Sequence, residues 1–595
     1  MNILLNCFPP TTIYQPDLGL SVLKQYLQSN NIECDIIYWN ILFDKIKKKT
    51  INQHFDNDII GALLPFFAQL YPKHIKDIEF ALQIRNPSWN IISPDEYNAF
   101  LLKSQRKINN IFNKWILSYN ILEKYTLIGL PYRFLQWVPG LIFITKLKQF
   151  NPNIKFVMGG FNTKYETVKF MESVDLIDYG IWGEGEIALT QLCEFHFNNE
   201  EEYPINVQSL VYKNKNGNYT YNNNKTEYTE LVTPDFSDFF RMNKQNKKLL
   251  YIPIERSRGC SWKKCMFCYL NDGYKFRKKS NDQVIATIDT LIKRHNIRVF
   301  NFNDNDLVCS DLFDLDDFLN KMIKYKSKKK IEIWSAEINS KLINENILKK
   351  FQKAGFKAFQ IGIEALSDSK LSKIKKESSF INHLYAIKFC VKHKIRILGA
   401  NIIMGFPDDT NEDIKMYINN LHYLRYYFSA YFSLSSVPLN VKYCSKYYKK
   451  ILSTDIRIWE SEVTSLIDHP IILNNKFYFF GHINKTYLYD WEHYNKVYSF
   501  YSRNNFKYKL NYDKETKKYE YIEILNDKEL YTLEFDKLDW KILRLCDSQI
   551  VTKEQIYSHF ETNRLIINKK ISRLIKERII YQSEIDGSLL SIINL

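Results

Sequence analysis

Short apolar runs alternate with helical patterns through the first 200 residues, and this alternation restricts the fold more than any other feature of the sequence. Five stretches read as buried strands with their end loops: residues 2–6, 34–39, 125–130, 154–160 and 176–186. Strands that alternate with helices predict a parallel, doubly wound sheet. The stretch between the second and third strands, residues 42–120, reads as a mostly helical insertion.

A doubly wound sheet binds its ligand beyond the carboxyl ends of its strands. The candidate binding residues at those ends are Gly159, Gly160, Asn162, Gly183 and Glu184. A Gly-Gly pair after a strand is also the ordinary sequence of a tight turn, so the set of loops carries more weight than any one of them. None of these loops contains a G-x-G-x-x-G sequence, which argues against a dinucleotide site.

Three cysteines, Cys260, Cys265 and Cys268, lie close together in the sequence RGCSWKKCMFC. A structural zinc site normally has four ligands in paired spacing, and the nearest downstream histidine, His295, is distant in sequence. Three unrelated buried thiols are improbable in so polar a stretch. An iron–sulfur cluster held by three thiolates would leave one iron open to bind a substrate or cofactor.

A second alternation of strands and helices surrounds the cysteines. Apolar runs followed by polar residues occur within residues 297–306, 331–339, 357–376 and 395–414. This pattern predicts a (β/α) repeat whose strand-end polar residues face one mouth.

The stretch ERSRGCSWKKCMFCYLNDGYKFRKK, residues 255–279, resembles the cluster loop of radical S-adenosylmethionine (SAM) enzymes. The usual spacing in that superfamily, C-x3-C-x2-C, is one residue shorter. The segments GIEALSDSKLSKIKK and IIMGFPDDT are similar to later strands of the same superfamily. The resemblance implies a partial barrel, a 4Fe-4S cluster on the three cysteines and SAM at the open iron.

The same resemblance assigns roles to residues at the strand ends. It implies that Phe267 packs near the adenine of SAM, and that Glu364 and Asn401 contact its methionine or ribose part. The residues that stand where the family binds the methionine amino group are Asp304, Asn305 and Asp306. The family's usual Gly-Gly-Glu is absent at that place, and each acid could also be a solvated strand end or helix cap.

A doubly wound domain ahead of a radical SAM core is usually a cobalamin-binding domain, and FVMGGFNT and VDLIDYGIWGEGE are similar to its end. The D-x-H-x-x-G motif that supplies a histidine ligand is missing. The resemblance therefore implies cobalamin held without a protein histidine on cobalt, or a degenerate domain that no longer binds it.

These observations together predict an α/β chain of several domains. The expected order is a cobalamin-binding-like Rossmann domain (1–200), a linker (201–245), a radical SAM partial barrel (246–450), an α+β substrate-side region (451–535) and a winged helix (536–595). A TKEQ capping box and a hairpin around Asp586 and Gly587 support the last assignment. A packing or peptide-docking role is favoured there over DNA binding.

The order of the parts resembles enzymes that mature ribosomally made peptides, a group that includes C-methyltransferases. The leading hypothesis is therefore cobalamin-dependent C-methylation of a precursor peptide, with flavodoxin or ferredoxin as electron donor. One alternative is peptide epimerisation or crosslinking without cobalamin, in which Cys309 or Cys444 would return a hydrogen atom; both are more simply ordinary cysteines. Another is radical SAM modification of RNA or a small molecule.

The formal net charge of +17 suits an anionic partner. No recognisable RNA-binding module accompanies it, so nucleic acid is not the expected partner. No signal sequence or apolar run long enough to span a membrane is evident. We expect a cytoplasmic monomer with reduced thiols and no membrane partner.

Overall fold

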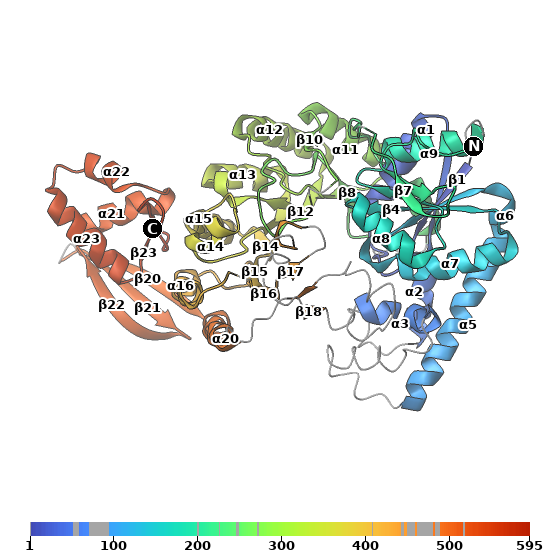
Figure 1. Cartoon of the computed structure of the whole chain (residues 1–595). Coiled ribbons are helices and arrows are strands. Elements are labelled where there is room, and N and C mark those ends of the chain that lie inside the picture. Colours follow the sequence, from blue (N-terminus) through green and yellow to red (C-terminus); the bar gives the residue numbers. More distant parts are fainter. Residues whose placement is uncertain are drawn as a thin grey trace.

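Figure 1 shows the computed structural model of the chain, in which a central part (green to yellow) lies between an N-terminal part (blue to cyan) and a C-terminal part (red). The structure describes residues 2–50, 59–70, 94–198, 202–224, 226–244, 249–270, 273–406, 408–441, 445–448, 459–460, 480–481, 488–515 and 518–595. Among these residues, no helix is both long enough and apolar enough to cross a membrane.

The N-terminal part is built on a seven-stranded sheet with strand order β2-β1-β3-β4-β5-β6-β7. The strands are β1 (Asn2–Cys7), β2 (Glu33–Tyr38), β3 (Leu127–Pro131), β4 (Lys155–Phe161), β5 (Tyr179–Trp182), β6 (Leu210–Lys213) and β7 (Tyr219–Tyr221). The first five are parallel, and β6 and β7 add an antiparallel edge. This confirms the predicted doubly wound sheet, and its strand order reverses between β1 and β3.

Helices cover both faces of this sheet, which explains why its strands are apolar on both sides. Leu4 of β1 packs into one hydrophobic cluster with α7 (Trp137–Phe150) and α8 (Lys164–Val174). Its neighbour Leu5 packs into another with α1 (Leu18–Ser29) and α9 (Glu186–Asn198). The two clusters are the cores that hold the domain together.

The predicted insertion at 42–120 is helical where the structure describes it, in α2 (Trp39–Thr50), α3 (Ile59–Leu70) and α5 (Pro94–Ser118). Residues 51–58 and 71–93 lie outside the described residues. Buried aromatic rings attach the insertion to the sheet, because Trp39 lies 4.9 Å from Phe112 of α5 and 5.0 Å from Phe143 of α7, centroid to centroid.

The central part contains a five-stranded parallel sheet with the order β14-β13-β12-β11-β8. Its strands are β8 (Ile252–Ile254), β11 (Val299–Phe302), β12 (Glu332–Ile338), β13 (Phe356–Ile361) and β14 (Arg396–Gly399). A parallel bridge from Glu364 to Ile402 joins it to the pair β15 (Asn401–Met404) and β16 (Ser435–Pro438). This confirms the predicted (β/α) repeat and its open, partial barrel.

Helices separate these strands and pack on the outside of the sheet: α11 (Asn281–His295), α12 (Leu312–Lys329), α13 (Glu345–Ala354) and α15 (Phe380–Lys392). Local sequence fixes their starts. Ser280 and Gln283 form a capping box at α11, and Asn344 caps α13 through the backbone N–H of Ile347. The strands are thereby held with their carboxyl ends at one side.

The C-terminal part begins with α20 (Leu488–Arg503) and an antiparallel sheet of β20 (Phe506–Asp513), β21 (Lys518–Leu525) and β22 (Lys528–Phe535). Three helices, α21 (Lys537–Ser548), α22 (Lys553–Ser558) and α23 (Arg564–Lys576), precede a hairpin of β23 (Ile580–Gln582) and β24 (Leu589–Ser591). Thr552 forms the expected capping box. The order of elements agrees with the winged-helix assignment, which stays a prediction.

One buried lysine fastens this C-terminal part to the barrel. Lys388 of α15 donates its Nζ to the Oδ1 of Asp547 at 2.7 Å and to the backbone carbonyl of the same residue at 2.9 Å. It also donates to the carbonyls of Ser591 at 2.8 Å and Ile593 at 2.9 Å. Burial lowers the pKa of Lys388 to about 8, against the attraction of Asp547. The ammonium group thus lies within hydrogen-bonding distance of four oxygens, which share its three N–H donors.

We expect the substitution Lys388→Met to lower the free energy of unfolding by about 3 kcal/mol, because it leaves the buried Asp547 carboxylate without its cation. The urea midpoint would report the loss. Lys392→Met is the control on the same helix, since Lys392 is a third exposed and pairs with Glu345 at 3.3 Å. Equal midpoints for the two variants would contradict this account of the C-terminal contact.

Candidate functional site

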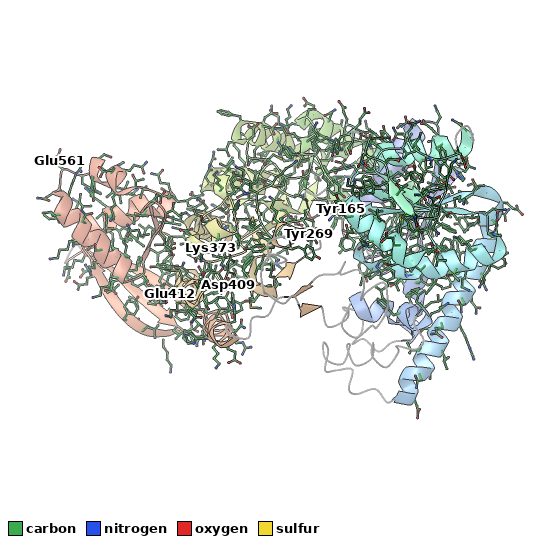
Figure 2. All side chains as sticks on the ribbon, viewed as in Figure 1. Tyr165, Tyr269, Lys373, Asp409, Glu412 and Glu561 are labelled. Carbon is green, nitrogen blue, oxygen red and sulfur yellow. The ribbon has the colours of Figure 1, made fainter. Side chains whose placement is uncertain are left out.

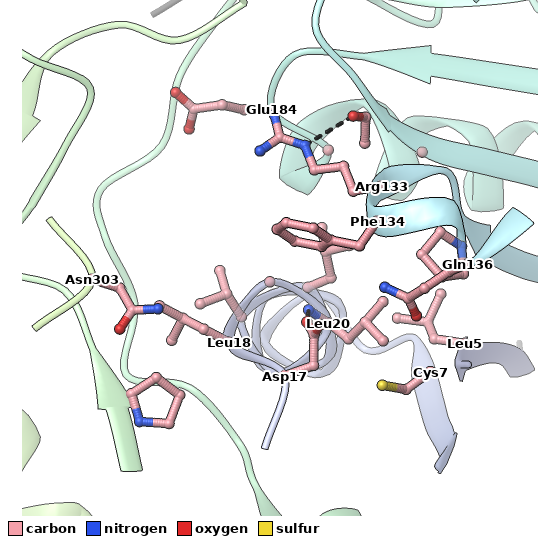
Figure 3. Close-up of a pocket in the computed structure, with 18 of the residues that line it drawn as sticks. Leu5, Cys7, Asp17, Leu18, Leu20, Arg133, Phe134, Gln136, Glu184 and Asn303 are labelled. Atoms are coloured by element: carbon pink, nitrogen blue, oxygen red, sulfur yellow. Dashed lines mark hydrogen bonds between the residues drawn. The ribbon is translucent and has the colours of Figure 1, made fainter. Parts of the chain in front are cut away.

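A cavity of about 630 Å³ lies between the N-terminal sheet and the barrel (Figure 3). On the N-terminal side its wall includes Cys7, Asp17, Leu18, Phe134, Gln136, Gly159, Gly160, Gly183 and Glu184. On the barrel side it includes Pro253, Ser257, Gly259, Leu270, Tyr274, Asn303 and Asn305. The cavity therefore opens at the carboxyl ends of β1 and β3, where the strand order reverses and where such sheets bind ligands.

The N-terminal wall combines apolar surface with unsatisfied polar groups. Gln15 lines the cavity, and its Oε1 is buried without a hydrogen-bond partner among the described residues. A Cβ atom on Gly159 would meet nothing within 4 Å, so the backbone of β4 faces open space there. These features suit a large ligand that carries hydrogen-bond donors and lies against the strand ends.

Phe134 occupies an unusual position in this wall. It is 73% exposed and has φ 56° and ψ 33°, in the left-handed region that non-glycine residues rarely adopt. Figure 3 shows its ring reaching from the loop after β3 toward α1. Backbone strain of this kind, which costs about 1–3 kcal/mol, collects at binding sites.

The three cysteines lie in a loop between β9 (Ser257–Arg258) and β10 (Arg277–Lys278), which pair with each other. All three thiols are partly buried and form no disulfide. Backbone and indole hydrogen bonds fix the loop on the barrel, because the Met266 N–H donates to the Ile374 carbonyl at 3.0 Å and Trp262 Nε1 to the Lys375 carbonyl at 2.8 Å.

The three thiols of this loop match the ligand set of an iron–sulfur cluster. A 4Fe-4S cluster binds each thiolate on a different iron, so three cysteines would hold it and leave one iron open. A structural zinc site normally has four ligands, and the loop supplies three cysteines. The ligand set of the loop therefore fits the cluster.

Lys376 is a functional candidate that sequence reasoning did not identify. Its Nζ lies 3.3 Å from the Oε1 of Glu364, and its charge also acts on the Cys265 thiol. Burial raises the pKa of Cys265 to about 11, and Lys376 opposes that rise. The lysine at the end of GIEALSDSKLSKIKK was visible in the sequence, but nothing there placed it beside the cysteines.

Glu364 and Asn401, the two residues expected to contact SAM, are neighbours at the mouth of the barrel. The Glu364 N–H donates to the Asn401 carbonyl at 2.8 Å, and Glu364 has a positive φ of 64°. Phe267 also reaches this place from the cluster loop, since its ring lies edge-on to Phe406 at 6.4 Å. The structure therefore brings these three predicted residues to one region, and their contacts with SAM stay predictions.

In the segment Asp304–Asn305–Asp306, both aspartates accept hydrogen bonds from other residues of the protein. Asp304 accepts hydrogen bonds from the Arg256 N–H at 3.1 Å and the Ser257 hydroxyl at 2.6 Å, and burial raises its pKa to about 6. Asp306 accepts from backbone N–H groups of the loops after β11 and β12. Asn305 lines the cavity. Asn305 is therefore the residue of this segment that is best placed to contact a ligand in the cavity.

Cys309 and Cys444 were considered as donors of a hydrogen atom, and the structure describes only Cys309. Cys309 is 6% exposed, and its thiol donates to the Asp306 carbonyl at 3.2 Å. Burial raises its pKa to about 12. Its thiol is thus turned into the protein. Cys444 lies outside the described residues.

Glu184 lines the cavity, but its carboxylate is already paired. It accepts from Arg258 Nη1 at 2.7 Å and from Arg277 at 2.7 and 2.5 Å. Arg258 also contacts Glu186 at 2.5 Å and Glu255 at 2.7 Å. Burial would raise the pKa of Glu184, but the two guanidinium groups hold it below its usual range. These ion pairs join the N-terminal domain to the strand that leads into the cluster loop.

Glu337, on β12, is another residue that the sequence did not single out. Glu337 is half-buried, and its carboxylate lies near the carboxylates of Glu364, Asp304 and Asp306 as well as the ammonium group of Lys376. Desolvation and the three acids raise its pKa to about 7, against the effect of Lys376. A desolvated carboxylate among like charges reduces stability, which is common where a residue is kept for ligand binding.

We expect Glu337→Gln to stabilise the ligand-free protein at pH 8 by about 1–3 kcal/mol and to leave its stability near pH 4 almost unchanged. The folded protein holds the Glu337 proton more tightly than the unfolded chain, so stability falls as the pH rises from the ordinary glutamate pKa toward about 7. Urea unfolding at several pH values measures this. An unchanged pH dependence in the variant would contradict the assignment.

Comparison with known proteins agrees with this geometry. Residues 254–421 match the model of the radical SAM superfamily. The chain is 26% identical over 272 residues to the uncharacterized methyltransferase PH0819 of Pyrococcus horikoshii, covering 45% of this chain and 58% of the relative. It is 24% identical over 281 residues to the anaerobic magnesium-protoporphyrin IX monomethyl ester cyclase of Rubrivivax gelatinosus, covering 45% and 49%. The chain thus spans about half the length of the curated relatives it matches.

Solved structures resemble the chain over a larger share of its length. The cobalamin-dependent SAM radical enzyme OxsB, solved with aqua-cobalamin and SAM, has a TM-score of 0.56 and 14% identity, and covers 83% of this chain and 65% of its own. The radical SAM methyltransferase TsrM of Kitasatospora setae has a TM-score of 0.49 and 14% identity, and covers 74% and 72%. The part of the chain that carries the cysteine loop and the barrel, residues 254–421, matches the radical SAM superfamily, and this match implies a 4Fe-4S cluster and SAM as cofactors.

Proposed function

We propose that the protein is a cobalamin-dependent radical SAM methyltransferase. The observation that carries the proposal is the cavity between the domains. One wall is the strand-order reversal of a doubly wound sheet, and the other is the barrel edge at Ser257 and Gly259, directly before the first cluster cysteine. A methyl carrier in this cavity would lie beside the place where the substrate radical forms.

The residues present fit cobalamin in three respects. The wall is partly apolar, as the corrin ring requires. The unpaired Oε1 of Gln15 can accept from a corrin carboxamide, and the bare backbone at Gly159 allows close approach. No histidine occurs among the described residues that line the cavity, which agrees with the missing D-x-H-x-x-G motif.

The bound groups would supply a 5′-deoxyadenosyl radical from SAM on the cluster and a transferable methyl group from cobalamin. The chain's own residues bind and orient them. Cys260, Cys265 and Cys268 would hold the cluster, while Phe267, Glu364 and Asn401 would position SAM at the barrel mouth. Lys376 places a positive charge between Glu364 and the thiolates. The two domain walls around the cavity, with the bound groups between them, would limit the access of water to the radical.

The substrate that we propose is a ribosomally made precursor peptide, with flavodoxin or ferredoxin as electron donor and a cytoplasmic monomer as the working form. The support is the order of the segments along the chain and their likeness to peptide-maturing enzymes. Epimerisation has less support, because the Cys309 thiol points into the protein and hydrogen-bonds there.

A methyl-transfer assay tests the proposal. Reconstituted protein with hydroxocobalamin and reductant would be given SAM with a deuterated methyl group, and the cobalamin would be analysed by mass spectrometry. We expect labelled methylcobalamin together with 5′-deoxyadenosine. Formation of 5′-deoxyadenosine without labelled methylcobalamin would contradict the methyltransferase function.

Gly159→Phe is a useful variant for this assay. Its side chain would enter the open space beside β4. We expect the variant to keep its iron and to lose cobalamin on desalting. Retention of both would place the methyl carrier elsewhere.

A further inference from the structure

Two glycines from different domains meet backbone to backbone beside the cavity. Gly183 follows β5, and Gly273 follows the third cluster cysteine; their φ angles are 72° and 82°. A Cβ on Gly183 would lie 2.7 Å from the Gly273 carbonyl oxygen, and one on Gly273 would lie 2.6 Å from the Asn162 carbonyl oxygen. Both positions therefore require glycine, for conformation and for space.

A hydrogen-bonded arginine adds a second contact at the same place. Arg133 Nη2 donates to the Tyr274 hydroxyl at 2.8 Å and to the Asn162 Oδ1 at 2.6 Å, and its Nε donates to the Gly160 carbonyl at 2.9 Å. Its guanidinium also lies over the Tyr274 ring, 5.5 Å from the centroid. Figure 3 shows Arg133 and Glu184 in the same part of the cavity wall.

The loop between β5 and α9 of the N-terminal domain thus contacts the cluster loop on both sides of its cysteines. Glu184 pairs with Arg258, two residues before Cys260, and its neighbour Gly183 contacts Gly273, five residues after Cys268. The loop between β5 and α9 was expected from sequence to contact the cofactor. Glu184 and Gly183 of this loop also contact the segment that carries the cysteines, through Arg258 and Gly273.

We propose that the loop after β5 is a positioning element for the iron–sulfur cluster, with Gly183, Gly273 and the Arg133–Tyr274 hydrogen bond as its positioning residues. Gly273 lies five residues after Cys268 in the sequence, and Arg258 lies two residues before Cys260, so these contacts hold the chain on both sides of the cluster ligands and set the distance of the cluster from the cavity. The same contact couples the ligand in the cavity to the cluster, and this second statement rests on the proposed function.

The positioning role is tested without cobalamin. Gly183→Ala and Gly273→Ala would be compared with Gly217→Ala, in which the glycine has a φ of 75° but a Cβ would meet nothing within 4 Å. The control thus carries the same conformational strain without the contact. After iron reconstitution, the midpoint potential of the cluster and its rate of bleaching by oxygen would be measured below the unfolding temperature.

We expect both contact variants to bind iron, to bleach several-fold faster than wild type and to show a shifted potential, while Gly217→Ala resembles wild type. Tyr274→Phe removes only the hydroxyl and should shift both quantities less, in the same direction; it decides the matter if the alanine variants do not fold. Potentials and bleaching rates equal to those of Gly217→Ala would overturn the positioning role.

The coupling is tested by adding hydroxocobalamin. We expect cobalamin to slow bleaching in wild type, and this protection to be absent in Gly273→Ala even where that variant retains cobalamin. Equal protection in both proteins would overturn the coupling. If wild type retains no cobalamin, the proposed function fails and the coupling with it, while the comparison without cobalamin still decides the positioning role.

Discussion

Replacing Cys260, Cys265 and Cys268 together with alanine removes the iron from the reconstituted protein and abolishes cleavage of SAM. Thiolates are the ligands that hold such clusters, and the variant removes all three thiols of the loop. Colorimetric iron analysis and the visible spectrum measure the loss, and chromatography of 5′-deoxyadenosine measures SAM cleavage.

A matched control keeps the number of removed thiols constant. Cys34, Cys193 and Cys390 are buried within the hydrophobic cores, and they are distant in sequence from the cluster loop. Their triple alanine variant should keep its iron, although it would be less stable. Retention of the full iron content by the variant of the loop cysteines would contradict the site.

Arg258→Met weakens the contact between the N-terminal domain and the cluster strand and lowers the free energy of unfolding by about 3–5 kcal/mol. Arg258 is the common partner of Glu184, Glu186 and Glu255, which are all buried, and these carboxylates hold its pKa above its usual range against the effect of burial. Without the guanidinium, Glu186 and Glu255 lose the ion pair that links them. The urea midpoint and limited proteolysis between the domains report the change.

Two further variants serve as controls for the Arg258→Met prediction. Arg298→Met removes an exposed arginine whose side chain hydrogen-bonds only to Asn296 among the described residues, and it should leave the free energy of unfolding within about 0.5 kcal/mol of wild type. Arg258→Lys keeps the charge but lacks the planar fork that bridges several carboxylates, so it should recover only part of the loss. A midpoint for Arg258→Met equal to that of Arg298→Met would contradict the role of the ion pairs.

The parts of the fold that depend on local pattern were predictable from the sequence. Apolar runs predicted the five parallel strands of the N-terminal sheet and the barrel strands β11 to β15, whereas β6 and β7 lie in the stretch predicted to be a linker and β8 was not predicted. The close spacing of Cys260, Cys265 and Cys268 predicted a cluster loop without any knowledge of its surroundings. Capping sequences such as the one at Thr552 fixed helix starts, because they act within one turn.

Partners that are distant in the chain were not predictable. Glu184 looks like a ligand-binding strand end, yet it pairs with Arg258 and Arg277, which lie 74 and 93 residues further along. Lys376 and Glu337 were missed for the same reason. A single sequence shows that a lysine or a glutamate is present, but only the packing of strands shows whether it has a partner.

The measurement that tests the account most directly is the metal content of anaerobically purified protein, reconstituted with iron and hydroxocobalamin and then desalted. The account predicts about four irons and about one cobalt per chain, with a visible spectrum that contains both the cluster and the corrinoid. Four irons without cobalt would contradict the methyl-carrier role of the cavity. Bound zinc without iron would contradict the cluster itself and with it the proposed chemistry.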